Sequence, residues 1–173
     1  MTQQQKGNIS IHAQNIMPII KRWLYSDKDI FVREMVSNGC DAITKEKMLH
    51  PDQECDYRVT VTLDKDANEI RFADNGIGMT AEEVEKYINQ VAFSGAEEGD
   101  NKGGIIGHFG LGFYSAFMVA DKVTIDTLSA SEGAEPVRWI SEDGMAFTME
   151  TGDRTERGTV ITLHISEEES EFL

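Results

Sequence analysis

The sequence is poor in cysteine and histidine, and each scarcity argues against a class of site. Only two cysteines occur in 173 residues, and Cys40 and Cys55 do not form a C-x-x-C pair. We therefore predict free thiols in a reducing compartment such as the cytoplasm, and no disulfide framework. The four histidines are scattered, and none is spaced as a ligand partner of another histidine or of a cysteine. This argues against a zinc site made of protein ligands alone.

Basic residues are also scarce. The chain has 16 lysines and arginines against 31 aspartates and glutamates, which gives a formal net charge of −15. This excess of negative charge argues against non-specific binding to nucleic acid or to an anionic membrane. No hydrophobic run predicts a transmembrane helix, and no signal peptide is recognisable. A bound phosphate would be held by backbone dipoles, by local cations or by a metal ion.

Glycine, by contrast, is concentrated in one place. Five glycines fall within residues 103–112, and Phe113 and the apolar stretch 114–120 follow directly. The apolar stretch predicts a short buried helix, so the glycines would lie at a helix N-terminus, where free N–H groups favour an anion such as phosphate. The spacing matches neither a Walker A loop nor the G-x-G-x-x-G dinucleotide motif. A flexible loop that happens to precede a helix explains these residues equally well.

Residues 30–49 predict a helix with a polar stripe. At about 100° per residue, one broad face is apolar and comprises Phe31, Val32, Met35, Val36, Ala42 and Ile43. Glu34, Asn38 and Asp41 share the other face. A solvent-exposed face is the ordinary interpretation, but such faces favour Lys, Glu and Gln over the poor helix former Asn. A carboxylate and a carboxamide one turn apart could instead orient a water molecule and complete the shell of a magnesium ion.

Asp74 stands at the end of a predicted strand over residues 69–74. Ile70 and Phe72 alternate toward the core, and the same parity turns Asp74 inward, where a carboxylate needs donors. The turn that follows contains Gly76 and Gly78. Two interpretations stay open: Asp74 binds a ligand, which we favour slightly, or it accepts hydrogen bonds from the amides of its own turn.

The remaining pattern places helices early and in the middle of the chain and strands mostly late. Further helices are predicted at 15–24 and from the N-cap Thr80 with its capping-box Glu83 to about residue 92. Further strands are predicted at 8–12, 57–63, 122–128, 137–140, 146–149 and 158–165. The first of these would be a short edge strand, and the alternation at 57–63 predicts a strand with one buried face. We therefore expect a single domain over residues 1–173, an α+β two-layer sandwich with helices on one face of a mostly antiparallel mixed sheet.

Three segments of the chain, in this order, resemble the three sequence boxes of the gyrase, chaperone, histidine-kinase and MutL ATPase superfamily. They are Glu34-x-x-x-Asn38-x-x-Asp41, Asp74-x-Gly76-x-Gly78 and Gly107-x-x-Gly110-x-Gly112-Phe113. The surrounding residues are most similar to the 90-kDa heat-shock chaperones of bacterial HtpG type, and the similarity runs from about residue 9 to residue 165. The resemblance implies the nucleotide-binding domain of such a chaperone, with the Bergerat-type ATP-binding fold.

The resemblance also implies roles for individual residues. Glu34 matches the general base that orients the attacking water, Asn38 the residue that completes the Mg²⁺ shell, and Asp74 the acceptor from the adenine amino group. The expected nucleotide-binding residues are completed by Asp41, Gly76, Gly78, Met79, Gly107, Gly110, Gly112, Phe113 and Thr159. Of these, the two glycines after Asp74 admit the purine with Met79 on its face, and Thr159 supports Asp74. The implied cofactors are ATP or ADP with Mg²⁺.

The function implied by the resemblance is that of an ATPase chaperone of the stress response, which acts on unfolded or partly folded client proteins. The longer protein would be a homodimer with cochaperones, whereas this chain would be a monomeric fragment. Three departures stand out: Phe93 where the family often has lysine, a shortened lid at 97–104, and an end near residue 173. We therefore expect this chain to bind ATP and ADP similarly and to hydrolyse ATP slowly at most.

Two other functions fit parts of the pattern. A phosphotransferase domain of the histidine-kinase branch shares the pocket, but Glu34 at the position of a water-activating base favours hydrolysis. A scaffold that keeps the fold without binding nucleotide is disfavoured by the presence of both Asn38 and Asp74.

Overall fold

The computed structural model describes residues 4–8, 28–88 and 112–173. Its strands form one seven-stranded sheet in the order β1-β6-β5-β4-β7-β3-β2, and every pairing between neighbours is antiparallel. The strands are β1 Gln5–Asn8, β2 Val59–Asp64, β3 Glu69–Asp74, β4 Ala120–Leu128, β5 Val137–Ser141, β6 Ala146–Thr151 and β7 Gly158–Ile165. The helices are α2 Ile30–Leu49, α3 Ala81–Tyr87 and the 3₁₀ helices η1 Tyr114–Met118 and η2 Glu167–Phe172.

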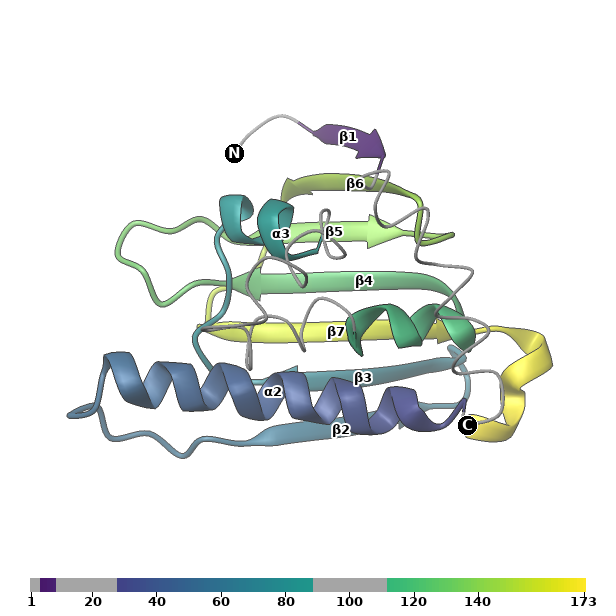
Figure 1. Ribbon diagram of the computed structural model, residues 1–173, viewed down its shortest axis with the longest axis horizontal. Coiled ribbons are helices and arrows are strands. Elements are labelled where there is room, and N and C mark those ends of the chain that lie inside the picture. Colours follow the sequence, from purple (N-terminus) through teal and green to yellow (C-terminus); the bar gives the residue numbers. More distant parts are fainter. Residues whose placement is uncertain (1–3, 9–27, 89–111) are drawn as a thin grey trace, which may run out of the picture.

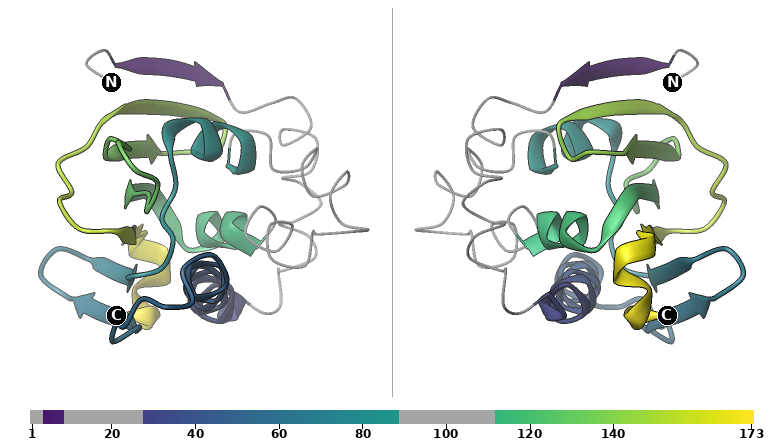
Figure 2. Two further views of the ribbon diagram at one scale, coloured as in Figure 1. Left: turned by 90° about the vertical axis from the view of Figure 1, so that its left-hand side faces the viewer. Right: turned by 90° about the vertical axis from the view of Figure 1, so that its right-hand side faces the viewer.

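The helices α2, α3 and η1 cover one face of the sheet (Figures 1 and 2). Helix α2 lies along β3, β2 and β7, and η1 packs between α2 and β4. This arrangement confirms the α+β two-layer sandwich. Among the described residues, no helix is both long and apolar enough to cross a membrane.

The core lies between the helices and the covered face of the sheet. Alternate residues of β4, β5 and β7 point into it, as the period of a half-buried strand requires. Phe113 and Trp139, both fully buried, meet edge to face with ring centroids 5.7 Å apart. Around them pack further buried side chains of η1 and the sheet, including Tyr114, Ile125, Met149 and Leu163.

The structure confirms most of the predicted elements. Helix α2 has the predicted bounds, and the four late strands all form. Thr80 makes the predicted capping box, because its hydroxyl accepts from the Glu83 amide while the Glu83 carboxylate accepts from the Thr80 amide. The stretch after Phe113 is a short buried helix, of 3₁₀ type. The predicted helix at 15–24, the loop at 97–104, Phe93, Gly107 and Gly110 lie outside the described residues.

Two expectations about exposure are wrong. The strand at 57–63 was expected to bury one face, yet Val61 and Leu63 of β2 are 42% and 52% exposed. The reason is that β2 is the outermost strand of the sheet, with a strand on one side only, and α2 covers it less than it covers β3. Val32, assigned to the apolar face of α2, is 41% exposed, and the helix instead buries Phe31, Met35, Asn38, Gly39 and Glu46.

The first strand also differs from its prediction at 8–12. Strand β1 spans Gln5–Asn8 and pairs with β6 at the edge of the sheet. Its edge position agrees with the expectation, whereas the predicted residues beyond Asn8 are not described.

Candidate functional site

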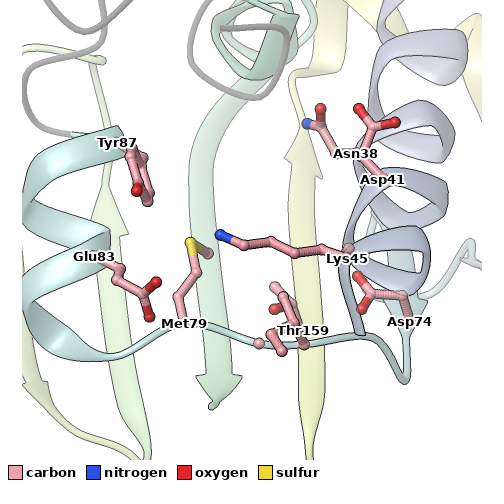
Figure 3. A pocket seen from close by; sticks show the side chains of 11 residues that line it. Asn38, Asp41, Lys45, Asp74, Met79, Glu83, Tyr87 and Thr159 are labelled. Carbon is pink, nitrogen blue, oxygen red and sulfur yellow. The ribbon is translucent and has the colours of Figure 1, made fainter. Parts of the chain in front are cut away.

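A pocket opens between α2, α3 and the sheet, and six of the twelve site residues expected from the sequence line it. It comprises about 530 Å³ of empty space, open mouth included. Its described lining consists of Asn38, Asp41, Ala42, Lys45, Asp74, Ile77, Gly78, Met79, Glu83, Tyr87 and Thr159. Figure 3 shows the polar side chains of α2 on one side of this pocket and those of α3 on the other.

Helix α2 supplies the polar stripe of the pocket. Asn38 is 2% exposed, so the interpretation of this face as solvent-exposed is wrong at its central residue. Both side-chain atoms of Asn38, the amide oxygen and the amide nitrogen, lack a hydrogen-bond partner within the described part of the chain. A buried polar group without a partner is costly, and its position on the pocket wall leaves it available to a ligand.

Glu34 lies one turn before Asn38, with 16% of its side chain exposed. The structure brings Gly112 against it: a Cβ atom on Gly112 would lie 2.2 Å from Glu34 Oε2. A side chain at Gly112 would therefore displace the Glu34 carboxylate from its present place. Phe113, the next residue, points its ring into the core, so a role for it in ligand binding would use its backbone.

Asp74 points its carboxylate toward the pocket from the end of β3 (Figure 3). Its Oδ1 accepts from the Gly76 amide at 2.9 Å, so the hydrogen bond to its own turn is present. Burial raises the pKa of Asp74 to about 6, and the Gly76 amide and the charge of Arg154 oppose that rise. The sequence left two interpretations open, and the structure shows that they are compatible, because the same carboxylate bonds the turn and lines the pocket.

Thr159 sits directly opposite Asp74 in the pairing of β3 with β7. The Thr159 hydroxyl lies 2.8 Å from the Thr127 hydroxyl. The Thr127 hydroxyl also accepts a hydrogen bond from the Met79 amide at 2.9 Å. Thr127 is fully buried on β4, and the sequence analysis did not single it out. A signal existed, because Thr127 follows Val123 and Ile125 on the inward face of its strand, where a hydroxyl needs a partner.

The two glycines after Asp74 are explained by backbone packing. A Cβ atom on Gly76 would lie 2.5 Å from the carbonyl carbon of Ala42 in α2. Gly78 has φ +66°, and a Cβ atom there would lie 2.0 Å from the Leu128 carbonyl oxygen of β4. The turn therefore runs in contact with both the helix and the sheet, and it delivers the nearly buried Met79 to the pocket.

The sequence analysis also missed Lys45, Glu83 and Tyr87 as lining residues. Lys45 continues the stripe of Asn38 and Asp41 by one more turn, so helical spacing alone could have included it. Its Nζ lies 6.0 Å from the centre of the Tyr87 ring of α3. Glu83 and Tyr87 are one turn apart on α3, but nothing in their spacing indicated which face of that short helix lines the pocket.

A metal site made of protein side chains alone is not present in the described residues, since they contain no cluster of three or more His, Cys, Asp or Glu side chains suited to an ion. Magnesium, however, keeps several waters and takes only one or two protein ligands when it is bound with phosphates. The unpartnered amide oxygen of Asn38 fits that limited demand.

The chain is similar to known proteins over nearly its whole length. Residues 25–151 match the family model described as histidine kinase-, DNA gyrase B-, and HSP90-like ATPase. The chain is 51% identical to the chaperone protein HtpG of Porphyromonas gingivalis over 98% of its own length and 26% of that protein. It is 50% identical to HtpG of Bacteroides fragilis with the same coverage. It is 40% identical to HtpG of Chromobacterium violaceum over 99% of its length and 29% of that protein. The chain thus spans about a quarter of the length of these relatives.

Proposed function

The chain belongs to the histidine kinase-, DNA gyrase B- and HSP90-like ATPase family, and from this premise we propose that it is the ATP-binding domain of an HtpG-type chaperone. The observation that carries the proposal is the pairing of two groups in one pocket. Asp74 offers an inward-facing acceptor, and the buried Asn38 offers an amide that has no partner among residues 4–8, 28–88 and 112–173. Adenine presents an amino donor and nucleotide phosphates bring a magnesium ion, so ATP and ADP match both groups.

We assign the binding roles along the pocket as follows. Asp74, supported by Thr159, accepts from the adenine amino group, and Met79 contacts the purine face. Asn38 contributes its amide oxygen to a nucleotide-bound Mg²⁺, and Asp41 lines the same wall. The glycine-rich loop that ends at Gly112 and Phe113, with Gly107 and Gly110 in its undescribed part, contacts the phosphates.

Hydrolysis would use Glu34 as the general base. Its carboxylate is largely buried and lies against Gly112, one helical turn before Asn38 of the pocket wall. From there it can accept the proton of a water that attacks the γ-phosphate. Bound Mg²⁺ would supply charge stabilisation for the phosphates. In the longer protein this ATPase cycle would drive conformational changes that act on unfolded client proteins.

The setting of that longer protein is part of the proposal. The relatives are chaperones about four times the length of this chain, by the 26% coverage. We propose a cytoplasmic, homodimeric chaperone of the stress response, in which cochaperones can take part, with this domain monomeric by itself. The scaffold alternative is disfavoured because Asn38 is buried and has no partner among the described residues, and a bound ligand would offset that cost.

Isothermal titration calorimetry tests the proposal directly. We expect the chain to bind Mg·ADP and Mg·ATP with similar affinity and to bind Mg·GTP far more weakly, because guanine offers an oxygen where adenine offers an amino group. Asn38→Leu is a matched variant that should lower the affinity for Mg·ADP much more than for ADP in the presence of a chelator. No heat of binding with any adenine nucleotide, from folded protein, would refute the proposal.

A further inference from the structure

The guanidinium of Arg157 joins segments that are far apart in the sequence, although Arg157 does not line the pocket. It stands just before β7, and its Nη1 lies 2.9 Å from Glu46 Oε2 on α2. Its Nε and Nη2 donate to the Asn75 carbonyl at 3.1 and 2.9 Å, and Nε also donates to the Gly76 carbonyl at 3.1 Å. One side chain therefore connects α2, the start of β7 and the turn after Asp74.

The Glu46 side of this connection is buried. Glu46 is fully buried near the end of α2, and its other oxygen, Oε1, lies 2.6 Å from His50 Nδ1. A buried carboxylate requires a compensating charge and hydrogen bonds, and Arg157 provides both. The position of the guanidinium is consequently fixed relative to the helix that carries Asn38 and Asp41.

The loop before β2 holds the same turn from the other side. The Arg157 guanidinium lies over the Tyr57 ring at 5.6 Å, and its Nη2 contacts Cys55 Sγ at 3.3 Å. The Asn75 side chain donates to the Asp56 carbonyl at 2.9 Å and accepts from the Arg58 amide at 2.8 Å. The carbonyl of Asn75 and the side chain of Asn75 are thus anchored independently.

The anchored turn is the segment that places the ligand-facing groups. Asp74, Gly78 and Met79 all line the pocket, and the two carbonyls held by Arg157 lie between them. The backbone of Asp74 is also pressed against β7, since a Cβ atom on Gly158 would lie 2.2 Å from the Asp74 carbonyl oxygen. A displacement of these carbonyls would therefore move the Asp74 carboxylate and Met79 together.

We propose that Arg157 is a positioning residue for adenine recognition: by holding the Asn75 and Gly76 carbonyls against Glu46 of α2, it sets the place of the Asp74 carboxylate. This inference rests on the proposed binding of adenine nucleotides. Arg157 itself touches no nucleotide. Its effect on affinity passes through the turn, in the way that outer-shell partners orient the groups that contact a ligand.

A purely structural role for the ion pair must be separated from positioning. Arg157→Met alone leaves Glu46 as an uncompensated buried charge, which can unfold the domain. The double variant Glu46→Met/Arg157→Met removes both charges and keeps apolar volume, but supplies no donor to the two carbonyls. Arg138→Met is the matched control, because Arg138 also forms an ion pair, with Asp126 at 2.7 Å, and Asp126 faces away from the pocket side of β4.

The decisive measurement is the affinity of the folded double variant for Mg·ADP, determined by calorimetry. The pH dependence of this affinity is measured as well. We expect a loss of affinity of about tenfold or more, in keeping with what displaced positioning groups cost. We also expect the pH midpoint of binding to fall below that of the parent. A looser turn admits water to Asp74, which weakens the effect of burial that raises the pKa of this carboxyl. Arg154 is the charged neighbour that acts on the same carboxyl. A uniform loss of stability would not move this midpoint.

A second readout needs no nucleotide. In the parent, the Gly76 amide bonds Asp74 Oδ1 and the Ile77 amide bonds the Ala42 carbonyl at 3.0 Å. Hydrogen exchange at these amides should be faster in the double variant and in Arg157→Lys, whose single ammonium cannot hold Glu46 and both carbonyls together. Arg138→Met should leave exchange and affinity unchanged.

The outcomes separate the two proposals. If the parent binds Mg·ADP and the folded double variant matches its affinity and midpoint, the positioning role is overturned and the proposed function stands. If the parent binds no adenine nucleotide, the proposed function fails and the positioning role fails with it. The positioning role would be established by two results together. The double variant would show reduced affinity, a lowered pH midpoint of binding and faster hydrogen exchange, and Arg138→Met would leave all three unchanged.

Discussion

The two ends of the pocket differ in how far the protein has already satisfied its own polar groups. At the end near Asp74, the carboxylate, Thr159 and Thr127 each have a hydrogen bond to another group of the chain. At the end near Glu34, the Asn38 amide has no partner in the described residues. The first end is preformed, so it can select a ligand by shape and hydrogen bonding. Within the described residues, the second end leaves this amide to whatever binds, which suits a group that arrives with its own metal ion and charge.

Glu34→Ala tests the chemical role of the unfinished end and should have the largest effect. In the longer chaperone that we propose carries this domain, ATP turnover should fall by about 10²- to 10⁴-fold, the usual contribution of a general base. Nucleotide affinity should stay close to that of the parent, because the base acts on water. Steady-state hydrolysis and calorimetry on the same preparation would measure the two quantities.

Glu82→Ala is a suitable control, since Glu82 is an exposed residue of α3 outside the pocket lining. It should change neither turnover nor affinity. If Glu34→Ala hydrolysed ATP at the rate of the parent, the assignment of Glu34 as the general base would be wrong.

Asp74→Asn tests the preformed end. We expect affinity for ADP to fall by about 10- to 100-fold, because a hydrogen bond to a charged group is lost and an amide donor can face the adenine donor. The folded domain should nevertheless gain stability. Since burial raises the pKa of Asp74 to about 6, its ionisation in the folded state carries a cost, and the amide avoids it. The gain at pH 7.5 should be about 1–3 kcal/mol.

Thermal unfolding of the unliganded proteins, beside ADP titrations, would check both parts of this prediction. Asp66→Asn makes the same substitution in the exposed turn after β2 and serves as the control. It should change neither the stability nor the affinity for ADP. If folded Asp74→Asn bound ADP as tightly as the parent, the assignment of Asp74 to the adenine amino group would be contradicted.

The same pKa predicts a pH dependence of binding. The folded pKa of about 6 lies above the ordinary value of 3.8, so the contribution of this carboxyl to stability is full below about pH 4 and is lost as the pH rises through 6. Binding should run in the opposite direction, because the proposed hydrogen bond from the adenine amino group is stronger to the ionised carboxylate. Affinity for ADP at pH 5 should be about tenfold weaker than at pH 7.5, as expected for one required deprotonation.

The groups that could obscure this titration can be named. Arg154 acts on Asp74 from the segment before β7, and Asp41 and Lys45 of α2 line the same pocket. Asp74→Asn should therefore flatten the pH profile of whatever binding remains. A profile that keeps its midpoint near 6 in this variant would assign the titration to another group.

Sequence and structure differ most where contacts depend on long-range packing. The stripe from Glu34 to Asp41 follows from helical geometry alone, and the inward parity of Asp74 follows from strand alternation. The ion pair between Glu46 and Arg157 could not be predicted, because no periodicity relates residues on α2 and before β7. The alternation of β2 predicted a buried face and failed at Val61 and Leu63, since local pattern does not say how far a helix extends over the outer strand.

Thr127→Val should have the smallest effect, and it probes how much of the preformed end depends on one hydroxyl. Thr127 accepts from the Met79 amide at 2.9 Å and lies 2.8 Å from the Thr159 hydroxyl. Valine keeps the shape of the side chain, so the core stays packed, but the Met79 amide loses its acceptor and Thr159 loses its neighbour. A net hydrogen bond is worth about 0.5–1.5 kcal/mol, which corresponds to a roughly 2- to 13-fold loss of ADP affinity. Thr127→Ser should recover the affinity of the parent, and Thr124→Val, the same exchange on the opposite face of β4, should leave it unchanged. If Thr127→Val binds ADP as tightly as the parent, the hydroxyl network is not needed, and the preformed character of this end must reside in the Asp74 turn alone.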